Sequence, residues 1–314
     1  MSGIDAKEAL QDAWQCNAEA VLASAIVMHA LGERAISVAR MKEGMTNDSF
    51  LVTTPRGKYI VRLNGIGSGH LISRTQEVRT YALLKGVGIS DEVLAIDPTY
   101  RGGYKISRYL KGARPCDPRC ESDVRLAMQH LRCFHALHLH VSYAFDVFAE
   151  ILRYEALVRE IGGDICSIDY AATKERVLSL QVLLEPLPKE MGLAHIDVVP
   201  DNVLFSGGRT YLIDWEYAAQ ADQHLDLAMF AVYAGYDEKE TRRLLALYFD
   251  RKPAPYITAK VFAYMAAAGL LWSNWCAFKT SCGETFGHYA DLQYEYARRF
   301  PILARHILEG VGDA

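Results

Sequence analysis

Hydrophobic and polar positions follow two different patterns along this chain, and the change between them divides it into two regions. In the first region, short runs rich in β-branched or aromatic residues are bounded by turn residues, as is typical of strands. These runs are 36–41, 49–54, 58–63, 93–96 and 104–110. Pro55-Arg56-Gly57 supplies the turn of a hairpin, and residues 72–85 predict a helix that glycines end. The pattern predicts a small antiparallel sheet with one helix inside it.

Helical patterns dominate the chain before and after these runs. Residues 5–31 predict an N-terminal helix, and the later predicted helices are 123–140, 147–161, 171–184, 225–234, 238–249, 257–278 and 288–308. Two short hydrophobic runs, 203–205 and 211–213, interrupt this pattern around Gly207-Gly208 and predict a second hairpin. Because residues 111–115 have linker composition, we expect an α+β fold with a sheet-containing domain at 1–110 and a helical domain at 111–314.

The composition is that of an ordinary globular protein and narrows the range of partners. Hydrophobic residues make up 51% of the 314 residues, and the formal net charge is −4, which does not favour a nucleic-acid partner. The seven cysteines include no Cys-x-x-Cys pair, so reduced thiols and a cytoplasmic location are expected. Acidic residues precede the apolar run at 20–31, which is the wrong charge pattern for a secretory signal.

One stretch, residues 261–278, is apolar enough to raise the question of a membrane span. Ser273 and Asn274 interrupt it, its length is marginal, and the chain has no second such stretch and no polybasic flank. A buried helix is therefore the preferred interpretation, and a membrane-associated protein is the remoter one. The histidines at 130, 135, 138 and 140 lack regularly spaced acidic or cysteine ligands, so a structural role is favoured over a metal site.

Polar residues gather at both ends of the second predicted hairpin. His195, Asp197 and Asn202 lie in the loop before its first strand, while Asp214 and Glu216 follow its second strand. Ionised carboxylates among apolar residues are rare unless they are paired or bind a metal. Phosphoryl transfer needs this set of groups, with one carboxylate to accept a hydroxyl proton and an Asn and another Asp to hold magnesium. A loop that satisfies its own polar groups is the alternative, and His195 is expected to orient the loop.

The spacing His195-x-Asp197-x4-Asn202, followed by Asp214-Trp215-Glu216, resembles the catalytic loop of the aminoglycoside phosphotransferase and choline/ethanolamine kinase group, which are relatives of the protein kinases. Further stretches are similar to choline kinases in particular: Gly44-Met45-Thr46-Asn47, Tyr59-Ile60-Val61-Arg62-Leu63 and Ile72-Ser73-Arg74-Thr75-Gln76-Glu77. The resemblance covers residues 36–280. It implies a two-lobed, protein-kinase-like fold with a small sheet lobe and a larger helical lobe.

The resemblance also implies a role for each candidate residue in an ATP- and Mg2+-dependent phosphotransferase. Asp197 would accept the hydroxyl proton, while Asn202 and Asp214 would ligate magnesium with Glu216 as helper. Arg62, held by Glu77, would steady the phosphates. The remaining nucleotide contacts would come from Gly44, Thr46 and Asn47 at the phosphates and from Arg108 and Leu110 beside adenine.

The acceptor prediction depends on Trp272 and Trp275, which a spacing of three residues places on one helix face. Two indoles suit a quaternary ammonium, and Tyr233 or Tyr236 is expected to add another wall. The predicted acceptor is therefore choline, with thiamine, ethanolamine or an aminoglycoside as alternatives. Asp226 resembles the family's aspartate that braces the catalytic loop. A non-catalytic binding protein of the same fold is the alternative outside enzymes, and the sequence makes no prediction of oligomeric state.

Overall fold

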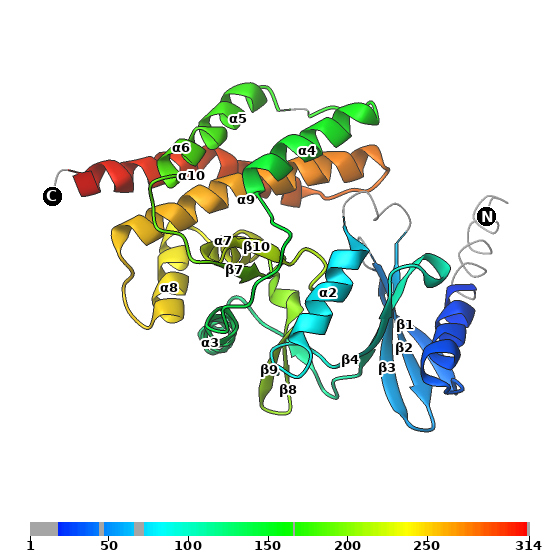
Figure 1. Cartoon of the computed structure of the whole chain (residues 1–314). Coiled ribbons are helices and arrows are strands. Elements are labelled where there is room, and N and C mark those ends of the chain that lie inside the picture. The colour runs from blue at the N-terminus through cyan, green and yellow to red at the C-terminus, as the bar shows by residue number, and fades with distance from the viewer. Residues whose placement is uncertain (1–17, 44–46, 66–71, 166, 313–314) are drawn as a thin grey trace. The chain divides into compact units, whose positions relative to one another are not determined.

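A computed structural model of the chain describes residues 18–43, 47–65, 72–165 and 167–312, which fold as two compact units (Figure 1). Unit 1 contains the chain up to Ala113 together with Ser206–Glu216, and unit 2 contains Arg114–Phe205 and Tyr217–Ala314. The segment Ser206–Glu216 lies in unit 1 although the sequence placed it in the second domain. A backbone hydrogen bond from the N–H group of Leu212 to the carbonyl of Ile89 ties this segment to unit 1, just beyond the helix of that unit.

The sheet of unit 1 has five strands and confirms the predicted α+β fold class. Its spatial order is β1 (Ser37–Glu43), β2 (Asn47–Thr54), β3 (Gly57–Asn64), β5 (Tyr104–Arg108) and β4 (Val93–Asp97). Every neighbouring pair is antiparallel. Between β3 and β4 lies the predicted helix, α2 (Arg74–Leu84), and a short 3-10 turn, η2 (Tyr100–Gly102), precedes β5.

Apolar and polar side chains alternate along part of β3, so one face of the sheet is apolar and the other carries charged residues. Tyr59 and Val61 are buried in an apolar cluster with Ala23 and Ile26 of the helix Ala18–Leu31. Because successive side chains of a strand point to opposite faces, Arg62 lies on the other face, opposite Lys105 of β5 in the strand register. The predicted residues 5–17 of the N-terminal helix lie outside the described part of the chain.

Unit 2 is mainly helical and is built around the long apolar helix α9. Its helices are α3 (Glu121–His135), α4 (Val147–Glu160), α5 (Tyr170–Leu178), α6 (Leu180–Leu184), α7 (His224–Tyr233), α8 (Glu238–Phe249), α9 (Pro255–Ser281) and α10 (His288–Gly312). Helix α9 contacts α4, α7 and α10. It is long and apolar enough to cross a membrane, but 83% of its most apolar window is buried inside the protein. This burial favours a core helix.

Two predicted helices of unit 2 are shorter than expected. The helix predicted at 123–140 ends at His135, because His138 takes a positive φ of 47° and the Leu139 carbonyl accepts a hydrogen bond from Leu193. The helix predicted at 171–184 breaks at Ser179, whose hydroxyl donates to the carbonyl of Arg176 at 2.7 Å. A serine that bonds back to the preceding turn competes with the helix hydrogen bonds.

Short strands missed by the sequence analysis position the central loop of unit 2. Strands β7 (Met191–Ala194) and β10 (Ala219–Asp222) pair antiparallel, and β6 (Arg114–Pro115) pairs with β8 (Val203–Ser206). The chain leaves β7 directly into residues 195–199 and then forms the short turn η3 (Pro200–Asn202). The runs predicted at 203–205 and 211–213 are present as β8 and β9 (Arg209–Leu212), on either side of Gly207-Gly208.

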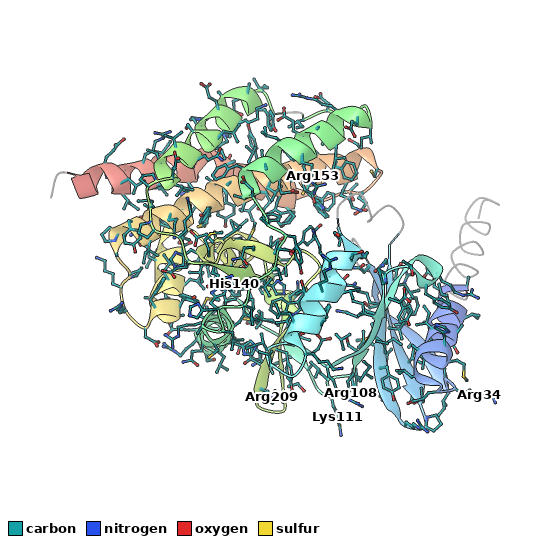
Figure 2. All side chains as sticks on the ribbon, in the orientation of Figure 1. Arg34, Arg108, Lys111, His140, Arg153 and Arg209 are labelled. Carbon is teal, nitrogen blue, oxygen red and sulfur yellow. The ribbon has the colours of Figure 1, made fainter. Side chains whose placement is uncertain are left out.

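Basic residues of both units lie in loops as well as on helices. Figure 2 shows Arg34 and Lys111 in unit 1, and His140 and Arg153 in unit 2. Arg34 and Lys111 are exposed, whereas Arg153 pairs with Glu150 on the same helix at 2.6 Å.

Candidate active site

Asp226 of α7 holds the start of the loop formed by residues 195–202, here called loop 195–202. Its side chain is fully buried and accepts hydrogen bonds from the backbone N–H groups of His195, at 2.9 Å, and Ile196, at 2.8 Å. The Nε2 atom of His135 lies 3.0 Å from the same carboxylate. Because an ionised carboxylate can only accept, His135 donates to it, and Tyr248 contacts the other ring nitrogen at 2.7 Å.

The backbone at Ile196 explains why this bracing is needed. Ile196 has a φ of 69°, in the left-handed region that β-branched residues rarely adopt. Such a conformation costs on the order of 1–3 kcal/mol and persists only where surrounding contacts fix it. The two bonds to Asp226 come from the nitrogen of Ile196 itself and from that of the preceding residue, His195, and they fix the turn. As a result, the next side chain, Asp197, leaves the loop in one defined direction.

Both carboxylate oxygens of Asp197 accept hydrogen bonds within unit 2. The hydroxyl of Tyr233 donates to Oδ1 at 2.7 Å, and the side-chain amide of Asn202 donates to Oδ2 at 3.1 Å. The same amide nitrogen also donates to the Asp197 carbonyl at 2.9 Å. Burial, followed by the charge of Asp197, raises the pKa of Tyr233 well above its ordinary value, so this hydroxyl stays protonated and donates. Asp197 is only partly buried, and it is therefore held in place and still reachable.

Aromatic side chains form a corner beside Asp197. The ring of Tyr233 lies 5.5 Å from that of Trp272, measured between centroids. Trp272 in turn meets Trp275 edge to face at 6.3 Å and Tyr217 edge to face at 6.1 Å. The two indoles stand nearly perpendicular, at 83°, so they line two sides of the corner. Electron-rich ring faces in such an arrangement attract an organic cation.

The structure separates the two tyrosines that the sequence left as alternatives. The hydroxyl of Tyr236 donates to the carbonyl of Pro118, and its ring packs against Phe230. The hydroxyl of Tyr233 donates to Asp197 instead, so the two tyrosines have different partners. Phe286, which the sequence analysis did not name, packs against Trp275 with its centroid 5.1 Å away. Neither residue type nor spacing marked Phe286, because it lies in the connection between α9 and α10.

The second group of candidate residues lies in unit 1 and centres on Arg62. Its guanidinium, which is almost fully buried, bonds to Glu77 at 2.7 Å and to Asp214 at 2.7 Å. The predicted ion pair between Arg62 and Glu77 is therefore present, and it is buried rather than exposed. A planar guanidinium can hold two carboxylates at once, which a lysine ammonium does less specifically.

Arg74 and Asn47 extend this group. Arg74 donates to Glu77 at 3.0 Å, to Glu216 at 2.7 Å and to the side-chain oxygen of Asn47 at 2.8 Å. Asn47 completes the ring by donating to Glu216 at 2.8 Å. The sequence analysis quoted Arg74 within a motif without assigning it a role. Its position three residues before Glu77 on one helix was the available signal, since such pairs face each other.

Three carboxylates of unit 1 lie close enough together to hold a metal ion. Glu77, Asp214 and Glu216 each offer an oxygen, and these atoms lie within 4.8 Å of one another. Burial and the charge of Asp214 raise the pKa of Glu216. For Glu77, burial acts in the same direction, but the neighbouring Arg62 and Lys105 outweigh it and the pKa is lowered. A buried cluster of carboxylate oxygens fits Mg2+, a hard cation that takes oxygen ligands.

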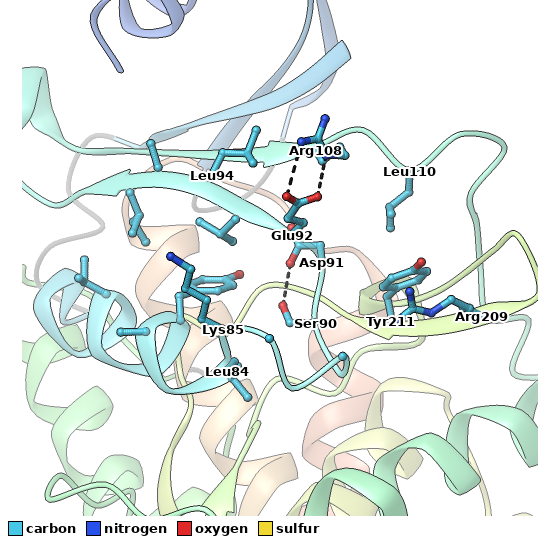
Figure 3. Close-up of a pocket in the computed structure, with 18 residues that line it drawn as sticks. Leu84, Lys85, Ser90, Asp91, Glu92, Leu94, Arg108, Leu110, Arg209 and Tyr211 are labelled. Carbon is cyan, nitrogen blue, oxygen red and sulfur yellow. Dashed lines mark hydrogen bonds and ion pairs between the residues drawn. The ribbon is translucent and has the colours of Figure 1, made fainter. Parts of the chain in front are cut away.

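Arg108 and Leu110, predicted to lie beside adenine, line a pocket of about 700 Å³ in unit 1. Figure 3 shows this pocket between α2, β4 and the segment that carries Arg209 and Tyr211. The Arg108 side chain is engaged by Glu92, at 2.6 Å. Contact of these residues with a nucleotide stays a prediction. Gly44 and Thr46 of the predicted phosphate loop lie outside the described residues.

The predicted site residues thus fall into two groups, one in each unit. Unit 1 brings together Asn47, Arg62, Glu77, Asp214 and Glu216, and unit 2 brings together Asp197, Asn202, Tyr233, Trp272 and Trp275. The gathering of Asp197, Asn202 and Asp214 around one ion stays a prediction, because Asp214 belongs to unit 1 and the other two belong to unit 2.

Comparisons with known proteins agree with the resemblance seen in the sequence. The family model "Choline/ethanolamine kinase" matches residues 38–253. The protein LicA of Haemophilus influenzae is 26% identical over 278 residues, which cover 84% of this chain and 79% of LicA. The crystal structure of the choline kinase LicA from Streptococcus pneumoniae is 30% identical, with a TM-score of 0.76, and covers 88% of this chain and 96% of that one. A structure of LicA in complex with AMP is 28% identical, with a TM-score of 0.77, over 91% and 99% of the two chains.

Proposed function

The chain belongs to the choline/ethanolamine kinase family, and from this premise we propose that it transfers the γ-phosphoryl group of ATP to the hydroxyl of choline. Asp197 carries the proposal, because both its oxygens are held in place beside an aromatic corner. A similar structure was solved with AMP, which supports a nucleotide as the other substrate.

In the proposed reaction, Asp197 accepts the proton of the choline hydroxyl as the oxygen attacks the γ-phosphorus. Phosphoryl transfer leaves the protein little covalent chemistry, so its task is to position the groups and balance charge. The bonds from Tyr233 and Asn202 fix the direction of the Asp197 carboxylate before the acceptor arrives. A fixed carboxylate avoids the reorganisation that a freely rotating side chain would need.

On the nucleotide side, Arg62 is the proposed contact to the phosphate oxygens, and Glu77 keeps its guanidinium oriented. Magnesium, when bound, would neutralise phosphate charge, with Asp214 and Glu216 as its carboxylate ligands. Asn202 is a further proposed ligand through its Oδ1, since its Nδ2 donates to Asp197. The negative charges of the carboxylates are balanced within the chain, because Arg62 and Arg74 form ion pairs with them. The carboxylates are those of Glu77, Asp214 and Glu216.

The aromatic corner supports choline over the other amino alcohols. A quaternary ammonium has no N–H group to satisfy and is attracted by ring faces alone, whereas the ammonium of ethanolamine loses hydrogen bonds to water there. Trp272 and Trp275 are only 4% and 5% exposed, so they belong to a compact site. An aminoglycoside, a bulky polycation, would call for a wide cleft lined by many carboxylates.

A substrate panel tests the proposal. ADP release would be measured with ATP, Mg2+ and choline, ethanolamine, thiamine or an aminoglycoside, and choline should give the highest kcat/KM. Asp197→Ala should lower turnover about 100- to 10,000-fold, the scale of a lost proton acceptor, and leave nucleotide binding nearly intact. Asp201→Ala, which changes an exposed aspartate of the same loop, is the matched control. Turnover that survives Asp197→Ala, or a clear preference for another acceptor, would contradict the assignment.

A further inference from the structure

Tyr233 contacts both parts of the proposed acceptor site with one side chain. Its hydroxyl lies 2.7 Å from Oδ1 of Asp197, the proposed proton acceptor. Its ring lies 5.5 Å from the ring of Trp272, inclined by 38°. A tyrosine is rigid beyond its second torsion angle, so its ring and its hydroxyl cannot move independently. The aromatic corner and the carboxylate are therefore held at a fixed separation.

Helix α7 supports this arrangement from its first turn to its last residue. Asp226, in the first turn, accepts the N–H groups of His195 and Ile196, while Tyr233, the last helical residue, donates to Asp197. Three consecutive residues of loop 195–202 thus bond to one helix. Residues seven apart lie on the same side of a helix, so both contacts fall on the face that α7 turns to the loop.

We propose that Tyr233 is a positioning residue that sets the distance between the cation and the hydroxyl of the acceptor, and so selects amino alcohols with two carbons between nitrogen and oxygen. This inference rests on the proposed function. A cation against the Tyr233 ring and a hydroxyl bonded to Asp197 must fit the span between the two ends of one phenol. A longer spacer would carry the hydroxyl past Asp197 or lift the cation from the ring.

The hydroxyl and the ring of Tyr233 then have separable effects. Tyr233→Phe keeps the ring beside Trp272 and removes the donor to Asp197. We expect the KM for choline to stay within about 2-fold, because the cation still meets the ring. We expect kcat to fall about 10- to 100-fold, the scale of one hydrogen bond to a charged group. Because Asp197 gains freedom to follow a displaced hydroxyl, discrimination against a longer acceptor should weaken several-fold.

The experiment compares choline with its three-carbon homologue, (3-hydroxypropyl)trimethylammonium, in ADP-release assays of the full chain. Tyr236→Phe is the matched control. Tyr236 lies three positions after Tyr233 in the sequence, and its hydroxyl bonds to the carbonyl of Pro118 instead of to Asp197. The unchanged chain should prefer choline strongly, Tyr233→Phe should lose much of that preference, and Tyr236→Phe should keep it. Thermal midpoints of all three proteins would be measured alongside, because a purely structural role would lower stability without changing the ratio.

The outcomes separate this inference from the proposed function. Turnover of choline by the unchanged chain, with the same kcat and the same acceptor ratio in Tyr233→Phe, would overturn the role of Tyr233 and leave the proposed function standing. Loss of turnover in Tyr233→Phe together with a raised KM and a lowered thermal midpoint would also overturn it. Absence of turnover with any acceptor by the unchanged chain would overturn both.

Discussion

Replacement of Asp226 by Asn tests whether one buried carboxylate holds loop 195–202. The carboxylate accepts two backbone N–H groups, from His195 and Ile196, and a third bond from His135. An Asn side chain keeps one acceptor oxygen and turns an NH2 group toward a donor. One bond to a charged group is then lost, which costs about 1.5–3 kcal/mol, and the fully buried donor it served is left unsatisfied.

The conformation of Ile196 offsets part of this cost. Once one of the two bonds to Asp226 is gone, the left-handed backbone at φ 69° is no longer fixed, and relaxing it releases on the order of 1–3 kcal/mol. Because the unsatisfied donor adds about 1–3 kcal/mol to the cost of the lost bond, the expected net loss of folding free energy is about 3 kcal/mol, with the loop free to move. A shift of Asp197 by about 1 Å is enough to lower kcat on the order of 100-fold.

Two measurements check this expectation. Urea unfolding gives the loss of stability, and native-state hydrogen exchange gives the opening of the loop, where the amides of His195 and Ile196 should exchange about 100-fold faster. Tyr248→Phe is the graded control, because it removes only the outer bond to His135 and should cost about 1 kcal/mol. The bracing argument is refuted if Asp226→Asn costs no more than Tyr248→Phe and the two loop amides keep their protection.

Two further predictions concern buried charge. Arg62→Met should destabilise the metal-free chain by about 3–5 kcal/mol, because it leaves the carboxylates of Glu77 and Asp214 without their shared partner. Added MgCl2 should then raise the thermal midpoint of this variant more than that of the unchanged chain, and equal shifts would contradict the metal assignment. For His224, burial and then the charge of Lys260 lower the pKa from 6.5 to about 4. Between these two pH values the imidazole is therefore protonated in the unfolded chain and neutral in the folded chain. Folding stability should fall by about 3 kcal/mol as the pH drops from 6.5 to 4, and His224→Phe should remove this dependence in urea titrations at several pH values.

Local patterns in the sequence were enough to predict the sheet of unit 1. Its strands are consecutive hairpins or nearly so, and the turn at Pro55-Arg56-Gly57 and the helix between β3 and β4 carry their own signals. The ion pair of Arg62 with Glu77 was predicted through resemblance, since spacing alone does not place a strand residue beside a helix residue. The structure adds that the pair is buried, which changes its energetic role.

The features missed in unit 2 depend on contacts between distant parts of the chain. Strand β7, Met191-Gly192-Leu193-Ala194, and strand β10, Ala219-Gln220-Ala221-Asp222, are four residues each and lack a clear alternation of apolar and polar residues. They become strands because they pair with each other. The sequence did not distinguish Tyr233 from Tyr236 for the same reason. Which of the two tyrosines contacts Asp197 depends on how α7 packs against a loop that is distant in the sequence.

The two polar networks have a consequence for how such a chain can change its acceptor. In unit 1, Arg62 bonds to Glu77 and Asp214, and Arg74 bonds to Glu216, while in unit 2 the carboxylate of Asp197 is held by Tyr233 and Asn202. Neither Glu77 nor Asp214 lies on α7 or α9. Substitutions on these two helices can therefore reshape the aromatic corner without removing either carboxylate from Arg62. Asn202 is the exception, because its amide nitrogen holds Asp197 while its oxygen is the proposed metal ligand, so its substitution should disturb both substrates at once.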